Sequence, residues 1–235
     1  MTFVQLIDCR TSRLDEMNRL MDDWVEQTKG KRTATHALVG RDRSDGSHIV
    51  EVVEFPSYEE AMRNSHLPET DKIFQGILAL CDETPTFTDL DVVRDERLAE
   101  DTVRRFLRTL AAPGELPPLN DLLDEDIHSH DPADPQDTIG LDNARKEYGM
   151  WRAAFDFGFT VEDVLAQGER ACARWRWDAT HKGDFLGIAP TGRQVAMTGT
   201  TMFRFGADGK IAEIWWHDDR LGLMQQLGAL DELET

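Results

Sequence analysis

The residues best suited to chemistry lie near the end of the chain, where polar and large apolar side chains alternate. The odd positions of this segment are Ile211, Glu213, Trp215 and His217, and Asp219 joins them if the strand extends that far. Because successive side chains of a strand point to opposite faces, these residues are predicted to share one face. A row with two carboxyls, an imidazole and an indole makes a poor hydrophobic core, so it is predicted to line a mixed polar pocket.

The chemistry of such a pocket wall is proton transfer. An apolar cavity raises the pKa of a carboxyl by desolvation, and a carboxyl with a raised pKa can accept a proton in one step and return it in the next. The residues that could provide the apolar surroundings are Trp215, Phe185, Met197, Trp151, Phe155 and Phe157. The alternative for Asp219 is structural, because an aspartate that precedes a terminal helix often caps it.

The elements that must position these residues are predicted from apolar spacing and from turn residues. Helices are expected at 96–111, 117–123, 140–154 and 219–227, and strands at 158–167, 170–180, 193–205 and 210–217. Helices that precede a long antiparallel sheet indicate an α+β fold rather than α/β.

This half of the chain contains several short motifs that follow one another in a specific order. Residues 180–192 read Thr-His-x-Gly-x-Phe-x-Gly-x-x-Pro-Thr-Gly, and residues 209–215 read Gly-Lys-Ile-x-Glu-x-Trp. Asp219 then stands three residues before Gly222-Leu223, and His130-Asp131-Pro132 lies upstream. Over about 96–228 the sequence resembles the SnoaL-like polyketide cyclase family.

The resemblance implies a cone-shaped fold of the nuclear-transport-factor type and a cofactor-independent aldol ring closure or isomerisation of a polyketide-like small molecule. It implies that Asp219 is the general acid/base and that no metal or cofactor is used. His217, His181 and His130 are candidate catalytic donors that polarise carbonyls. The expected substrate-binding residues are Trp215, Glu213, Phe185, Met197 and Trp151.

The first part of the chain has a different pattern. Strands are expected at 2–9, 33–40, 48–55 and 86–93, and helices at 13–28, from 57, and at 69–82. This order is the split βαβ pattern of ferredoxin-like domains. It resembles the antibiotic-biosynthesis-monooxygenase group, whose members pair as dimeric α/β barrels. The expected domains are therefore 1–95 and 96–235, in a homodimer or higher homo-oligomer.

Composition excludes several classes of function. The chain has 45 acidic against 26 basic residues and a net charge of −19, which disfavours nucleic acid and anionic membranes as partners. No apolar run is long enough to span a bilayer, and the N-terminus does not read as a signal peptide. Three widely spaced cysteines form no disulfide framework or metal motif, so a cytoplasmic protein is expected.

Three alternative functions stay open at this point. The first is another enzyme on the same cone, although an isomerase of the ketosteroid type needs a tyrosine and this domain has only Tyr148. The second is a protein that binds a small apolar molecule without catalysis. The third is a cofactor-free monooxygenase carried by residues 1–95.

Overall fold

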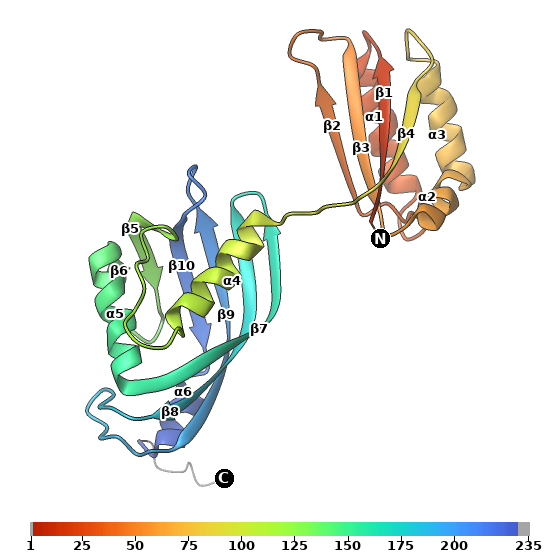
Figure 1. Ribbon diagram of the computed structural model, residues 1–235. Helices are drawn as coiled ribbons and strands as arrows, with labels where there is room; N and C mark the ends of the chain where they lie inside the picture. Colours follow the sequence, from red (N-terminus) through yellow and green to blue (C-terminus); the bar gives the residue numbers. More distant parts are fainter. Residues whose placement is uncertain (1, 230–235) are drawn as a thin grey trace. The chain divides into compact units, whose positions relative to one another are not determined.

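The computed structural model describes residues 2–229, and the chain divides into two compact units between Asp95 and Glu96 (Figure 1). Each unit has its own sheet and its own buried core. Among the described residues, no helix combines the length and apolar character that a membrane span requires.

The first unit is a four-stranded antiparallel sheet with helices packed against one face. Its elements are β1 (Phe3–Arg10), α1 (Leu14–Gln27), β2 (His36–Arg41), β3 (His48–Phe55), α2 (Tyr58–Ser65), α3 (Pro68–Leu78) and β4 (Thr86–Asp91). The strand order is β2-β3-β1-β4. The expected elements are all present, but α3 ends four residues earlier than predicted.

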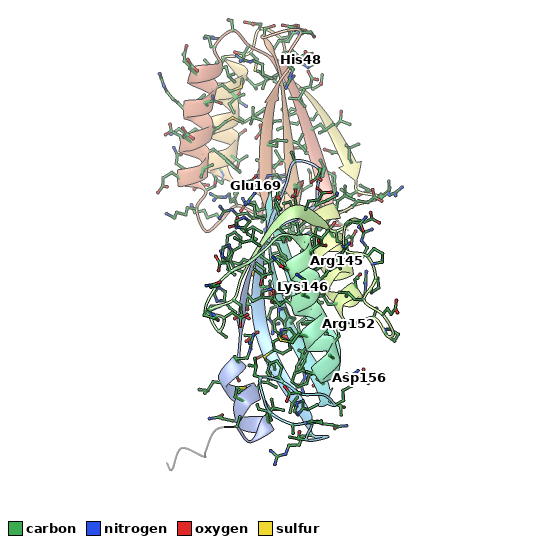
Figure 2. All side chains as sticks on the ribbon, turned by 90° about the vertical axis from the view of Figure 1, so that its left-hand side faces the viewer. His48, Arg145, Lys146, Arg152, Asp156 and Glu169 are labelled. Carbon is green, nitrogen blue, oxygen red and sulfur yellow. The ribbon has the colours of Figure 1, made fainter. Side chains whose placement is uncertain are left out.

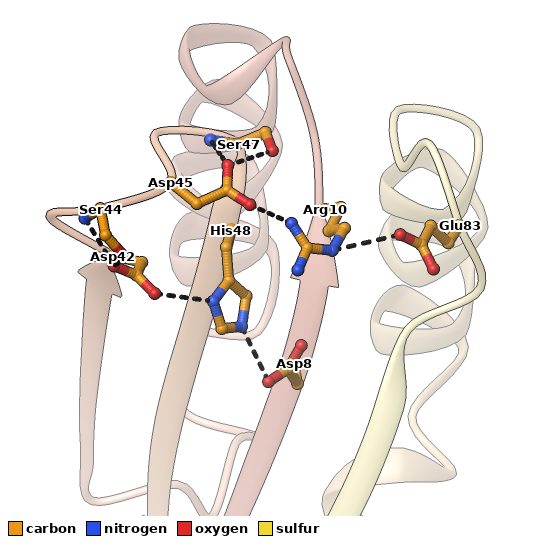
Figure 3. Close-up of polar contacts among 8 residues, drawn as sticks. All are labelled: Asp8, Arg10, Asp42, Ser44, Asp45, Ser47, His48 and Glu83. Carbon is orange, nitrogen blue, oxygen red and sulfur yellow. Dashed lines mark hydrogen bonds and ion pairs between the residues drawn. The ribbon is translucent and has the colours of Figure 1, made fainter.

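A histidine of this unit lies between two carboxylates at the start of β3. His48 Nε2 is 3.0 Å from Asp8 Oδ2, and His48 Nδ1 is 3.3 Å from Asp42 Oδ2 (Figure 3). The hydrogen bonds that its ring N–H groups donate to Asp8 and Asp42 raise the pKa of His48 above its ordinary value. The imidazolium form is therefore favoured in the folded state.

This cluster predicts a pH-dependent contribution to the stability of the first unit. The contribution is fully present below the unfolded-state pKa of His48 and is lost as pH rises through the higher folded-state pKa. The measurement is the difference in unfolding free energy between wild type and His48→Gln, followed by NMR signals of the first unit. We expect this difference to shrink as pH rises, and a constant difference would contradict the prediction.

The second unit is a six-stranded sheet covered on its concave side by two long helices. Its elements are α4 (Leu98–Leu110), β5 (Leu123–His130), β6 (Thr138–Ile139), α5 (Leu141–Ala154), β7 (Phe155–Gln167), β8 (Arg170–His181), β9 (Gln194–Phe205), β10 (Ile211–Asp218) and α6 (Arg220–Leu227). The order is β6-β5-β10-β9-β8-β7, and β5 and β10 are parallel while the other neighbours are antiparallel.

One predicted element of this unit is wrong. Residues 117–123 form an extended segment and a turn that lead into β5, not a short helix. The reason is that Pro117 and Pro118 stand in succession, and a residue before a proline is driven away from helical backbone angles. The strand β5, which was not predicted, follows directly.

The core of the second unit is built from aromatic side chains that fill the concave side of the sheet. Trp175, Trp177, Phe106 and Phe203 are almost completely buried. Trp175 Nε1 donates a hydrogen bond to Thr201 Oγ1 over 2.8 Å, so its indole has a fixed position.

Helix α5 is tied to the end of α4 by one side chain. Arg145, Lys146 and Arg152 follow one another along α5 in Figure 2. The guanidinium of Arg152 donates hydrogen bonds to the backbone carbonyls of Leu110, Ala112 and Gly114. These carbonyls lie at and just beyond the C-terminus of α4, where helical partners are missing. The two helices therefore hold one another over the sheet.

Candidate functional site

A cavity of about 50 Å³ lies in the second unit, between the concave face of the sheet and helices α4 and α5. Its walls are mostly aromatic, with a group of charged side chains. The lining residues are Leu110, Asp131, Glu147, Tyr148, Trp151, Phe157, Phe159, Trp175, Trp177, Met197, Trp216, Asp218 and Arg220. An apolar cavity with a few convergent polar groups is the usual form of a small-molecule site.

The charged group of this cavity centres on Arg220, the first residue of α6. Its Nη2 is 2.6 Å from Asp131 Oδ2 and 3.4 Å from Asp218 Oδ2. Its guanidinium also lies 4.7 Å from the centroid of the Trp151 ring. The side chains of Asp218, Asp131 and Arg220 are 7%, 11% and 16% exposed. Asp131 is therefore the closer partner of Arg220, and Asp218 is held less tightly.

Two carboxyls that line the cavity have raised pKa values. Burial raises the pKa of Asp218, and the nearby Arg220 only partly offsets this effect. Burial also raises the pKa of Glu147, whose buried Oε2 atom finds no hydrogen-bond partner within residues 2–229. Perturbed carboxyls in an apolar cavity are suited to proton transfer.

The cavity also contains a neutral hydrogen-bond donor. Tyr148 is 5% exposed, and burial raises the pKa of its hydroxyl far above the ordinary value. The Tyr148 oxygen makes no hydrogen bond of good geometry with the described residues, and Ser129, whose Oγ accepts a hydrogen bond from Trp216 Nε1, lowers its pKa only in part. The Tyr148 hydroxyl is therefore a protonated donor with no partner among the described residues.

Asp219 does not line this cavity. Its side chain is exposed and accepts a hydrogen bond from the backbone N–H of Gly222 over 2.9 Å, as the N-cap of α6. His217, a predicted catalytic donor, is also exposed. The predicted orientation of both side chains is wrong, and the structural alternative for Asp219 describes its geometry.

The reason is a β-bulge at the start of β10. Ile211 pairs with Phe205 and Glu213 pairs with Arg204, so two steps along β10 match one step along β9. After the bulge the even positions Ile214, Trp216 and Asp218 face the cavity side. Side chains alternate between the two faces as predicted, but after the bulge the even positions, not the odd ones, face the cavity.

Beyond the bulge, Glu213 and Trp215 of β10 form a separate cluster on the opposite face of the sheet. His130 Nε2 is 3.0 Å from Glu213 Oε1, and His130 Nδ1 is 2.9 Å from Asp137 Oδ2. The imidazole stacks on Trp215 with 5.3 Å between the ring centroids, and Arg204 Nε is 2.8 Å from Glu213 Oε2. His130, Glu213 and Trp215 are therefore together, but outside the cavity where they were predicted.

The other predicted site residues lie in or behind the cavity wall. Met197 and Trp151 line the cavity. Phe185 is buried and packs on Trp151 with 4.7 Å between ring centroids, so it supports the wall from behind. His181 is fully buried, and its Nδ1 accepts a hydrogen bond from the Thr191 backbone N–H over 3.2 Å. That contact closes the loop between β8 and β9, away from the cavity lining.

Sequence reasoning missed the polar residues that do line the cavity: Asp218, Arg220, Asp131, Glu147 and Tyr148 in this role. One signal was available for Asp218. Asp218 shares the even positions of this strand with Ile214 and Trp216, which are both large and apolar. These positions make a more hydrophobic face than the odd ones, which contain a carboxylate and an imidazole. Within residues 2–229, no group of three or more His, Cys, Asp or Glu side chains is arranged to hold a metal ion.

Comparison with known proteins gives a consistent picture. The sequence model described as SnoaL-like polyketide cyclase matches residues 101–227. A structure from Jannaschia sp. CCS1, provisionally described as a SnoaL-like polyketide cyclase, is 23% identical and has a TM-score of 0.52. The match covers 60% of this chain and 99% of that one, so it shows the shared fold.

A second structure, from Acidithiobacillus ferrooxidans, is provisionally described as a polyketide cyclase. It is 27% identical with a TM-score of 0.50, and the match covers 60% of this chain and 100% of that one. No match was found among curated proteins.

Proposed function

Because this chain belongs to the SnoaL-like polyketide cyclase family, we propose that its second unit closes a ring in a polyketide-like molecule by an aldol reaction, with Asp218 as the acid/base. One observation carries the proposal. The Asp218 carboxyl lies at an aromatic cavity, has a raised pKa, and is held less closely than Asp131 by Arg220.

The proposed reaction balances with the groups of the cavity alone. The Asp218 carboxylate removes a proton from the carbon next to one carbonyl. The resulting enolate carbon forms a bond to a second carbonyl carbon of the same molecule, and the electrons of that carbonyl move to its oxygen. The protonated Asp218 then returns the proton to this oxygen, so no oxidant or reductant is consumed.

Two further residues support the developing negative charge. The hydroxyl of Tyr148 and the guanidinium of Arg220 are donors on the cavity wall, and the buried Nε of Arg220 has no partner in the described part of the chain. Donors of this kind stabilise an enolate or alkoxide most in a site that excludes water.

The cavity volume of about 50 Å³ is small for this substrate class. Sites for drug-sized ligands have about 300–1,000 Å³. We therefore expect the cavity to widen when a substrate binds.

The family resemblance favours Asp219 for the same role, and Asp219 is our second candidate. Its place in the motif supports it, whereas its exposed capping geometry favours Asp218. The first unit is a separate proposal: the order β2-β3-β1-β4 supports a ferredoxin-like domain of the dimeric α/β barrel type.

The test is incubation of the full chain with a linear aromatic β-polyketone ester in deuterated buffer. We expect a cyclised isomer of the substrate to form faster than without protein, and, where the deprotonation reverses, deuterium in the recovered substrate at the carbon next to the activated carbonyl. The enzyme proposal would be overturned if the ester binds but neither product nor deuterium exchange exceeds the rate without protein. That result would favour a non-catalytic binding protein.

A further inference from the structure

The first unit has a hollow centre between its sheet and its helices. A cavity of about 380 Å³ lies there, within the size range of small-molecule sites. Its walls come from α1, with Met21 and Trp24, from α3, with Phe74, and from the sheet, with Val53 and Phe87.

The hollow separates two small clusters of core residues. One cluster contains Phe3 and Phe55, and the other contains Cys9 and Ile49. Along β1 and β3 the positions between these clusters, on the same face of the sheet, include Gln5 and Glu51. Polar residues therefore occupy the middle of a face that would otherwise be continuous hydrophobic core.

Glu51 is the unusual residue of this cavity. It is paired in the sheet with Ile7 on β1 and Val39 on β2, and both of these line the cavity beside it. Burial raises the pKa of Glu51 to about 7. Glu51 is half-buried, and among the described residues its carboxyl has no hydrogen bond or ion pair, although it costs free energy to hold an unpaired carboxylate largely out of water. Such a group in a cavity is typical of a ligand site.

The charge of the lining restricts the ligand. Glu51 and Asp71 are the ionisable carboxyls of the lining, which contains no lysine or arginine. Arg32 lies 5.9 Å from the centroid of the Trp24 ring but does not line the cavity. An anionic ligand would be repelled, and a cation would form the strongest, charge-assisted hydrogen bond with the Glu51 carboxylate.

The aromatic walls restrict the ligand further. Trp24 Nε1 donates a hydrogen bond to Thr70 Oγ1 over 3.0 Å, which fixes the indole in the wall. Phe74 packs against Phe87 with 5.5 Å between ring centroids. Flat aromatic walls favour a ring system and also attract cations.

We propose that the first unit binds a ring-containing nitrogen cation, with its charged N–H group against the Glu51 carboxylate and its rings against Trp24 and Phe74. This site is separate from the cavity of the second unit and does not depend on the ring-closure proposal.

The test is a titration of the full chain with the fluorescent cation 9-aminoacridine at pH 7.5, followed by fluorescence anisotropy. Acridine, which has the same rings but is neutral at this pH, serves as the matched probe. We expect Glu51→Gln to weaken 9-aminoacridine binding at least about tenfold, as loss of a charge-assisted hydrogen bond does, and to leave acridine binding nearly unchanged.

Glu54→Gln is the matched control, because it removes a carboxylate of the same strand that does not line the cavity. It should bind 9-aminoacridine as wild type does. Equal loss in both variants would indicate adsorption to an acidic surface and overturn the proposal. Absence of 9-aminoacridine binding by wild type, or equal binding of acridine, would also overturn it.

If Glu51→Gln does not fold, the pH dependence of 9-aminoacridine binding by the wild-type protein tests the proposal instead. The ionisable groups that face Glu51 are Asp71 from α3 and the Cys9 thiol on β1. Protonation of Glu51 should weaken 9-aminoacridine binding as pH falls from 8 to 6, where the probe remains a cation. Constant affinity over this range would contradict the proposal.

Discussion

The Asp218→Asn variant is expected to lose about 10²- to 10⁴-fold in kcat/KM for ring closure, the usual contribution of a positioned acid/base. Asparagine keeps the shape of the side chain but cannot take up the substrate proton. The fold should survive, because the replaced carboxyl is disfavoured by burial and Arg220 keeps Asp131 at 2.6 Å. Steady-state kinetics with the β-polyketone ester measure the effect.

The neighbouring residue provides the matched control for this variant. Asp219→Asn removes a charge one position away but keeps the helix cap, because asparagine is also a preferred N-cap residue. We expect kcat/KM within about twofold of wild type, the scale of a surface change that leaves the cap in place. The opposite result, with activity lost only in Asp219→Asn, would assign the acid/base to Asp219.

The pH dependence distinguishes proton transfer from a structural effect of Asp218. The active base is the carboxylate, so kcat/KM should rise with pH through the raised pKa of Asp218. Asp218→Asn should lack this rise. If the same profile persists in the variant, another group must be the base.

The second large effect is expected for stability in Gly199→Ala. A methyl group at Gly199 would lie 2.4 Å from Trp175 Cζ2 and 2.8 Å from the His217 carbonyl oxygen. Trp175 is 1% exposed and cannot move without breaking its bond to Thr201. We expect a loss of about 3 kcal/mol, in the upper part of the range for overpacked cores. This corresponds to a fall of about 10 °C in the Tm of the second unit, measured by calorimetry.

Gly158→Ala in β7 is the matched control. Apart from its two neighbours in the chain, none of the described residues has a heavy atom within 4 Å of the position of its added methyl group. We therefore expect an unchanged or slightly higher Tm, because alanine restricts the unfolded chain more than glycine does. A similar fall of Tm in both variants would show that the loss of stability comes from replacing a strand glycine as such. It would not then come from the clash with Trp175.

Most elements of both units follow from local sequence patterns. Apolar spacing and turn residues predict the long strands and helices to within a few residues, because side-chain periodicity is a property of each segment alone. The turn at 117–123 was missed because the apolar residues around Pro117 and Pro118 have helical spacing that the prolines override. Local pattern thus predicts most of the elements, although it did not predict β5.

The candidate sites could not be predicted in the same way. The face on which Asp218 lies depends on how β10 pairs with β9, which is a contact between distant segments. Glu51 stands in a strand whose sequence does not alternate, so nothing local indicates that its side chain faces the helices. Both residues become visible only when the neighbouring strands and helices are in place.

The bulge in β10 has a consequence for comparison between relatives. The extra residue reverses which side chains of the strand face the cavity. Identical residues at aligned positions can therefore face substrate in a protein with the bulge and solvent in a protein without it. The Gly-Lys-Ile-x-Glu-x-Trp motif would be intact in both. Roles can therefore be transferred along this motif only between proteins that share the irregularity, and the backbone pairing of β9 and β10 should be compared before the side chains are.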